Sequence, residues 1–174
     1  MTDHRHLPRP AVLGWAAALA AAAVLCALSG WTYGSVRGDS ALSYGKARDA
    51  ALSAARSGVT RLTTADPAHS ARDLDGWLAV STGALRDQLT RTRSADAATL
   101  KASGTASRGT VTDAAVTELD NRAGTAKVIA TVQVRLTPKS GAASTDRKRF
   151  EADLARTGGT WRVAALTAVP LGAS

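Results

Sequence analysis

The sequence contains only one cysteine, Cys26. A single thiol cannot form a disulfide within the chain, and it cannot supply the several thiolates of a cysteine metal cluster. The cysteine count therefore excludes a disulfide framework, and it leaves the redox compartment of the protein undetermined.

Aromatic side chains are scarce as well, because the 174 residues include only four tryptophans, two tyrosines and one phenylalanine. A core must therefore be built mainly from leucine, valine and alanine. The scarcity also argues against nucleic-acid binding, which uses aromatic platforms beside a basic stripe, since Trp77 and Trp161 both fall at predicted core positions. The formal charge of +8 comes from scattered basic residues, and their densest group is Arg147–Arg149.

One long segment carries no charge at all, from the residue after Arg9 to the residue before Arg37. A tryptophan stands near each end of it. A helix needs about 20 apolar residues to cross a bilayer core of ~30 Å, and aromatic residues are enriched at both membrane interfaces. We therefore predict a short head over residues 1–10 and a transmembrane helix over residues 11–35.

A cleaved segment is the alternative to a permanent membrane span. Signal peptides have a shorter apolar region followed by a small-x-small site, and Ala27–Ser29 could serve as that site, which would start the mature chain at Gly30. A lipoprotein signal is disfavoured because Leu25 precedes Cys26, where a small residue is normally required.

Three helices are predicted after the membrane segment, over Ser40–Leu62, Ser70–Leu78 and Thr82–Lys101. In the first helix, small and apolar residues recur at helical spacing and form a narrow face that permits close packing. Ser70 and Asp73 are predicted to form a capping pair at the start of the second helix.

The pattern changes from helical to alternating in the second half of the chain. The predicted strands are Thr110–Leu119, Ala126–Leu136, a strand with Phe150, Ala152 and Leu154 facing inward, and Thr160–Val169. The second strand alternates most cleanly, with Ile129 as its one exception, as is typical of a half-buried antiparallel strand. Gly104, Gly109 and Gly124 are interpreted as turn glycines, and Gly158-Gly159 predicts a tight hairpin.

Helices followed by a four-strand meander predict an α+β domain, here over residues 40–171. A curved sheet that wraps the long first helix would leave a conical cavity between the two.

Five segments of the chain resemble the Mce-associated membrane proteins of actinobacteria. They are Lys46–Ala55, Leu62–Thr64, Ser81–Leu89, Gly109–Val116 and Gly159–Val163. The resemblance extends from the membrane helix to about Val169, and it implies an NTF2-like fold for residues 40–171. It also implies a non-enzymatic accessory role in the assembly or stability of Mce systems, which import lipids and sterols through the cell envelope.

The resemblance further implies a single-pass protein of the cell membrane, with its head inside and its C-terminal domain outside. The expected partners are the membrane and Mce-type transport proteins, with no nucleic acid. Fold-level analogy adds a homodimer through the sheet. The alternative is an extracytoplasmic binder of a small lipid-like ligand, or an NTF2-like enzyme, that uses the cone pocket.

An NTF2-like enzyme generally places an aspartate or histidine deep in the cone, where apolar walls shift its pKa. Three residues could be considered for this role. His69 lies in a polar loop and is expected at the surface, Asp96 is expected to mark the end or a kink of its helix, and Asp113 is expected at a strand edge or bulge. Motifs for nucleophilic catalysis or for phosphate and dinucleotide binding do not occur. We therefore assign no catalytic, cofactor-binding or metal-binding residue, and we expect no cofactor.

Overall fold

The structure is a computed structural model that describes residues 41–170. Gly45–Ser174 forms one compact unit, and only residues 41–44 of the other unit, Met1–Tyr44, are described; they are helical. The predicted head and transmembrane helix lie outside the described residues, as do both end residues of the predicted domain. Within the described part of the chain, no helix is both long and apolar enough to cross a membrane.

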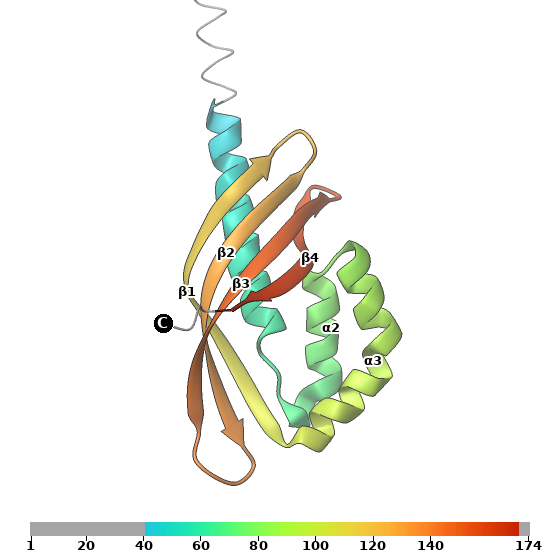
Figure 1. Cartoon of the computed structure of the whole chain (residues 1–174). Coiled ribbons are helices and arrows are strands. Elements are labelled where there is room, and N and C mark those ends of the chain that lie inside the picture. Colours follow the sequence, from blue (N-terminus) through green and yellow to red (C-terminus); the bar gives the residue numbers. More distant parts are fainter. Residues whose placement is uncertain (1–40, 171–174) are drawn as a thin grey trace, which may run out of the picture. The chain divides into compact units, whose positions relative to one another are not determined.

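The three predicted helices are present (Figure 1). The first covers residues 41–62, and a single 3₁₀ turn, η1 (Pro67–His69), leads from it toward α2 (Ser70–Val80) and α3 (Gly83–Ser103). Proline disfavours helical geometry in the residue before it and removes a backbone donor, which explains why Pro67 starts a new short helix instead of extending the first one.

The predicted capping pair of α2 is wrong. His69 occupies the N-cap of α2 without a side-chain hydrogen bond. The Asp73 carboxylate instead accepts a hydrogen bond from the backbone N–H of Asp66, at 2.7 Å. The spacing of Ser70 and Asp73 did fit a capping box, but the preceding 3₁₀ turn places Asp73 within reach of a different donor.

The four predicted strands form one antiparallel sheet in the order β1-β2-β3-β4. Their bounds are β1 (Thr105–Asp120), β2 (Thr125–Pro138), β3 (Ser144–Thr157) and β4 (Thr160–Val169). β1 begins five residues earlier than predicted, because its first residues pair with the end of β2, from Thr105 opposite Pro138 onward. Gly104 and Gly124 adopt positive φ as turn glycines do, whereas Gly109 lies inside β1, so its interpretation as a turn glycine is wrong.

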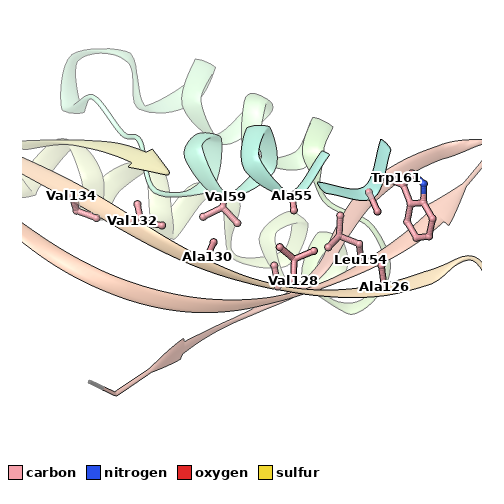
Figure 2. Packing of buried hydrophobic residues seen from close by; sticks show 11 residues of the cluster. Ala55, Val59, Ala126, Val128, Ala130, Val132, Val134, Leu154 and Trp161 are labelled. Carbon is pink, nitrogen blue, oxygen red and sulfur yellow. The ribbon is translucent and has the colours of Figure 1, made fainter. Parts of the chain in front are cut away.

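The core joins the narrow face of the 41–62 helix to the inner face of the sheet (Figure 2). Along β2 every second residue from Ala126 to Val134 is buried, as the alternation predicted, and the exception Ile129 is 37% exposed. The helix contributes Ala51, Ala55 and Val59, all fully buried. These small side chains let the helix backbone approach the sheet closely.

α2 and α3 pack side by side, and α3 lies next to β4 at one edge of the sheet (Figure 1). The connection between them is fixed to β4 by a hydrogen bond from the Thr82 N–H to the Val163 carbonyl, at 2.9 Å. The predicted core position of Trp161 is confirmed, since this side chain is 7% exposed. Trp77 is only half-buried, and its indole N–H donates to the Thr64 carbonyl at 3.1 Å.

Candidate functional site

A groove of about 1080 Å³ lies beside the C-terminal half of the 41–62 helix. Its other walls are the segment from Thr64 to Asp73 and the paired ends of β1 and β2. Five arginines line it, and they come from four separate parts of the chain: Arg56, Arg61, Arg72, Arg108 and Arg135.

Two threonines follow the 41–62 helix, and one of them, Thr64, lines the groove. The hydroxyls of Thr63 and Thr64 donate to the carbonyls of Val59 and Thr60, at 2.7 and 2.8 Å. The Thr64 bond satisfies an acceptor that a helix end otherwise leaves open, whereas the Val59 carbonyl also accepts from the Thr63 N–H at 3.0 Å. The Thr64 hydroxyl also accepts from the Gly109 N–H at 3.2 Å. The Leu62–Thr64 motif is therefore a joint between the helix and β1.

Gly109 allows this joint to close. A Cβ atom at this position would lie 1.8 Å from the Thr63 hydroxyl oxygen, so no larger residue fits. Next to it, Ala65 and Ser107 exchange two backbone hydrogen bonds, at 2.8 and 2.9 Å. The edge of β1 is thus covered by the protein's own chain at the groove.

The floor of the groove contains one buried carboxylate, Asp73, whose residue is 6% exposed. A buried carboxylate needs compensating partners, and Asp73 has both the Asp66 N–H and the Arg61 guanidinium, the latter at 3.4 Å. The Arg61 side chain lies against Gly76, where a Cβ atom would come within 2.1 Å of Arg61 Nε. A glycine at position 76 is therefore what lets Arg61 reach Asp73.

The second carboxylate of the groove, Asp66, lies at the rim. It accepts from His69 Nδ1 at 2.7 Å and from the Ala68 N–H at 2.9 Å, and it thereby caps η1. The hydrogen bond from His69, followed by the one from Ala68, lowers the pKa of Asp66 below its ordinary value of 3.8, and the positive field of Arg72 acts in the same direction. Both aspartates of the groove are therefore occupied by internal partners.

The arginines far outnumber these acids. Five arginines against two aspartates leave the groove with a formal charge of +3 when His69 is neutral. Arg61 is paired with Asp73, but the side chains of the other four arginines make no hydrogen bond or ion pair with any residue from 41 to 170. Arg108 and Arg135 also stand directly opposite each other in the β1–β2 register.

The residues considered from sequence lie elsewhere or at the rim. Asp113 is exposed beside a β-bulge in β1, as expected. Asp96 is half-buried within α3, rather than at its end, and accepts from the Thr92 hydroxyl at 2.6 Å. His69 is exposed, as expected, and it is the only one of the three that lines the groove.

Sequence reasoning did not find the groove, because its arginines are not clustered along the chain. One signal was available in the alternation of β2, which places Arg135 on the solvated face of the sheet. The partner of Arg135 could not be known, since the register that brings Arg108 opposite it belongs to a part of β1 that lacks clear alternation.

A smaller hollow of about 450 Å³ lies where β1 ends and β2 begins. Glu118, Asp120 and Asp153 line it together with Lys127, and Asp153 Oδ1 is buried without a hydrogen-bond partner. Across the described part of the chain, however, no group of acids, histidines or cysteines has a geometry suited to a metal ion.

Three helices and a four-strand antiparallel meander define an NTF2-like α+β domain, the class of fold also found in VirB8-like proteins. The chain belongs to the family "Uncharacterized protein Rv1363c/MT1408-like", whose model matches residues 10–170. Family membership is consistent with the resemblance to an actinobacterial family. Among curated proteins, none matches the chain by sequence.

Solved structures with this fold share little sequence with the chain. The periplasmic domain of DotI has a TM-score of 0.57 at 12% identity, covering 69% of this chain and 93% of that one. An IcmL-like type IV secretion system protein from Legionella pneumophila has a TM-score of 0.56 at 9% identity, covering 71% and 92%. CagV of Helicobacter pylori, a VirB8 homolog, has a TM-score of 0.54 at 10% identity, covering 70% and 97%. At these identities the likeness shows the fold alone.

Proposed function

We propose that the protein is a non-enzymatic accessory protein of an Mce-type system that imports lipids or sterols. Residues 11–35 would anchor it in the cell membrane, and the NTF2-like domain would face the outside and contact partner proteins. Its contribution would be to the assembly or stability of the complex and not to chemistry.

The observation that carries this proposal is the use of the same fold in multi-protein systems. CagV and the IcmL-like protein are described as type IV secretion system proteins, and the DotI domain as periplasmic. A domain of this kind held near a membrane is suited to contacting other subunits. The Mce-type partner itself is supported by the resemblance of segments such as Lys46–Ala55 and Leu62–Thr64.

A non-enzymatic role is also favoured by the state of the carboxylates. A general acid or base needs a pKa near the working pH and access to substrate, and the pKa of Asp66 is shifted the other way, below its ordinary value. Asp113 is exposed, and the aspartates of the groove are held by internal hydrogen bonds. An apolar cone for a lipid-like ligand is supported less, because Ala55, Val59 and Val128 fill the space between helix and sheet (Figure 2).

The proposal is tested by co-purification. The protein, tagged at its C-terminus, would be extracted from native membranes in mild detergent and its companions identified by mass spectrometry. Mce-type subunits or their permease in near-equal amounts are the expected result. Recovery of the tagged protein alone, from cells that express an Mce operon, would refute it, and light scattering of that sample would show whether a homodimer through the sheet exists.

A further inference from the structure

We propose that the arginine-lined groove is an anion-binding site that takes a ligand bearing phosphate groups. The inference does not depend on an Mce-type partner, because it rests only on side chains within residues 45–170. Its three supports are the surplus of charge, the facing arginines of β1 and β2, and the covered edge of β1.

The surplus of charge is a property of the built groove and not only of its composition. Its two carboxylates are already engaged, Asp73 by Arg61 and Asp66 by His69. Arg56, Arg72, Arg108 and Arg135 find no acceptor among the described residues. A concave surface lined by charge of one sign focuses its field and concentrates counter-ions. An anion would therefore meet several unused donors in one place.

The facing arginines are the sharpest feature. Arg108 and Arg135 are direct partners in an antiparallel pair, where side chains start about 5 Å apart and like charges destabilise the sheet. On β3, Asp146 lies opposite Val134, the residue before Arg135, and is already paired with Lys148 at 3.8 Å. An anion bound between the two guanidinium groups would convert this repulsion into two charge-assisted hydrogen bonds.

The type of donor points to phosphate. Among the residues that the structure describes, five arginines and no lysine line the groove. Guanidinium groups present planar pairs of N–H donors that match the oxygens of phosphate and carboxylate, and arginine is the preferred residue where such groups are recognised bidentately. A compact, multiply charged oxyanion can engage several of these forks at once.

An acidic peptide is a less suitable ligand. Peptides that bind beside a sheet commonly add a strand to its free edge through backbone hydrogen bonds. At the groove this edge is already used, because Ser107 pairs with Ala65 and the Gly109 N–H donates to Thr64. A phosphate group requires no free edge, since side chains alone can hold it.

The phosphate can come from a free ion or from a lipid head group, and the experiment separates the two. The full chain in an uncharged detergent would be titrated with pyrophosphate by calorimetry. In a second arm, the detergent micelles would be doped with phosphatidic acid or with phosphatidylcholine, and the thermal midpoint would be compared.

The variant that tests the site is Arg108→Gln with Arg135→Gln. The matched control is Arg147→Gln with Arg149→Gln, which removes the same charge from the exposed face of β3 outside the groove. Loss of two charge-assisted hydrogen bonds should weaken binding at least tenfold in the first pair. The control pair should change it less than threefold, and added salt should weaken binding by the unchanged protein.

Two results support the proposal and assign the source. Pyrophosphate binding that is lost only in the groove variant indicates a free phosphate ligand. A thermal midpoint that is raised by phosphatidic acid but not by phosphatidylcholine, and that loses this rise only in the groove variant, indicates a lipid head group. Two results overturn it: no binding in either arm, or an equal loss in both variant pairs.

Misfolding does not confound the test, because the groove variant removes a repulsion. Without ligand its thermal midpoint should equal or exceed that of the unchanged protein. If the glutamine pair nonetheless fails to fold, the Arg108→Lys and Arg135→Lys pair keeps the charge and removes the planar forks. That pair should still weaken binding, and unchanged binding would refute the bidentate site.

Discussion

Replacing Gly58 by alanine should destabilise the protein only while Val163 is present. Gly58 is buried in the 41–62 helix, and a Cβ atom there would lie 2.7 Å from Val163 Cγ2 of β4. A contact this short requires the helix or the strand to shift. Overpacking of this kind costs about 1–3 kcal/mol, while alanine is favoured over glycine inside a helix by about 1 kcal/mol. The difference predicts a net loss of about 0–2 kcal/mol from these two terms.

The effect of Gly58→Ala on the free energy of unfolding should change from a loss to a gain when Val163 is replaced by alanine. Val163 is fully buried, so Val163→Ala alone destabilises the core. In that background the added methyl of Gly58→Ala has space, and the helix propensity of alanine then predicts a gain of up to about 1 kcal/mol. A double-mutant cycle isolates this coupling.

The cycle would be measured by urea unfolding of the full chain, followed by tryptophan fluorescence. Gly45→Ala is the matched control, because Gly45 lies in the same helix with nothing within 4 Å of its Cβ direction. It should stabilise the protein by up to about 1 kcal/mol whether or not Val163 is present. An effect of Gly58→Ala that is the same in both backgrounds would show that Val163 does not set the helix–sheet distance.

Two further predictions concern the core and the rim of the groove. Leu154→Ala should lower the free energy of unfolding by about 2–5 kcal/mol, because Leu154 is 2% exposed. Ile129→Ala, on the outer face of the sheet, should lower it much less. Equal losses in thermal or urea unfolding would contradict the assignment of the two faces. An NMR titration should place the pKa of Asp66 below 3.8, mainly because of the hydrogen bond from His69. Since the folded value is the lower one, the stabilisation from Asp66 is complete above pH 3.8 and is lost as the pH falls through the folded pKa. His69→Gln should move the pKa of Asp66 back toward 3.8. If the titration midpoint of Asp66 does not move, His69 is not the cause of the lowered pKa.

The sheet could be predicted where one periodic signal decides it. The alternation of Ala126–Leu136 identified the inner face of β2, because an antiparallel strand with one solvated face must alternate. The Gly158-Gly159 hairpin and the bounds of β4 were equally clear. The start of β1 was not, because Thr105–Gly109 contains Ala106 as its one apolar side chain and therefore shows no apolar alternation.

The groove could not be predicted for a different reason. Its charged residues are separated by as many as 79 positions, from Arg56 to Arg135, and only the folded register brings them to one surface. The Leu62–Thr64 motif was recognised as a feature of the family resemblance. Its physical role, to end the helix and hold Gly109, appears only when β1 is placed beside it.

The existence of a hollow at this end of the domain follows from a mismatch in length. β1 has 16 residues, which at about 3.3 Å each extend over roughly 50 Å. Residues 45–62 of the helix, at 1.5 Å each, extend over only about 27 Å. The excess falls at the end of the helix, because Thr63 lies against Gly109 and the first four residues of β1 continue beyond that point in their pairing with β2. The segment from Thr64 to Asp73 covers that extension only in part. A hollow is thus a consequence of the fold, but its charge is not, since the four arginines that have no partner among residues 41–170 contribute nothing to the packing of the core. The arginines, rather than the hollow, are the evidence for a ligand, and they are what the Arg108 and Arg135 substitutions test.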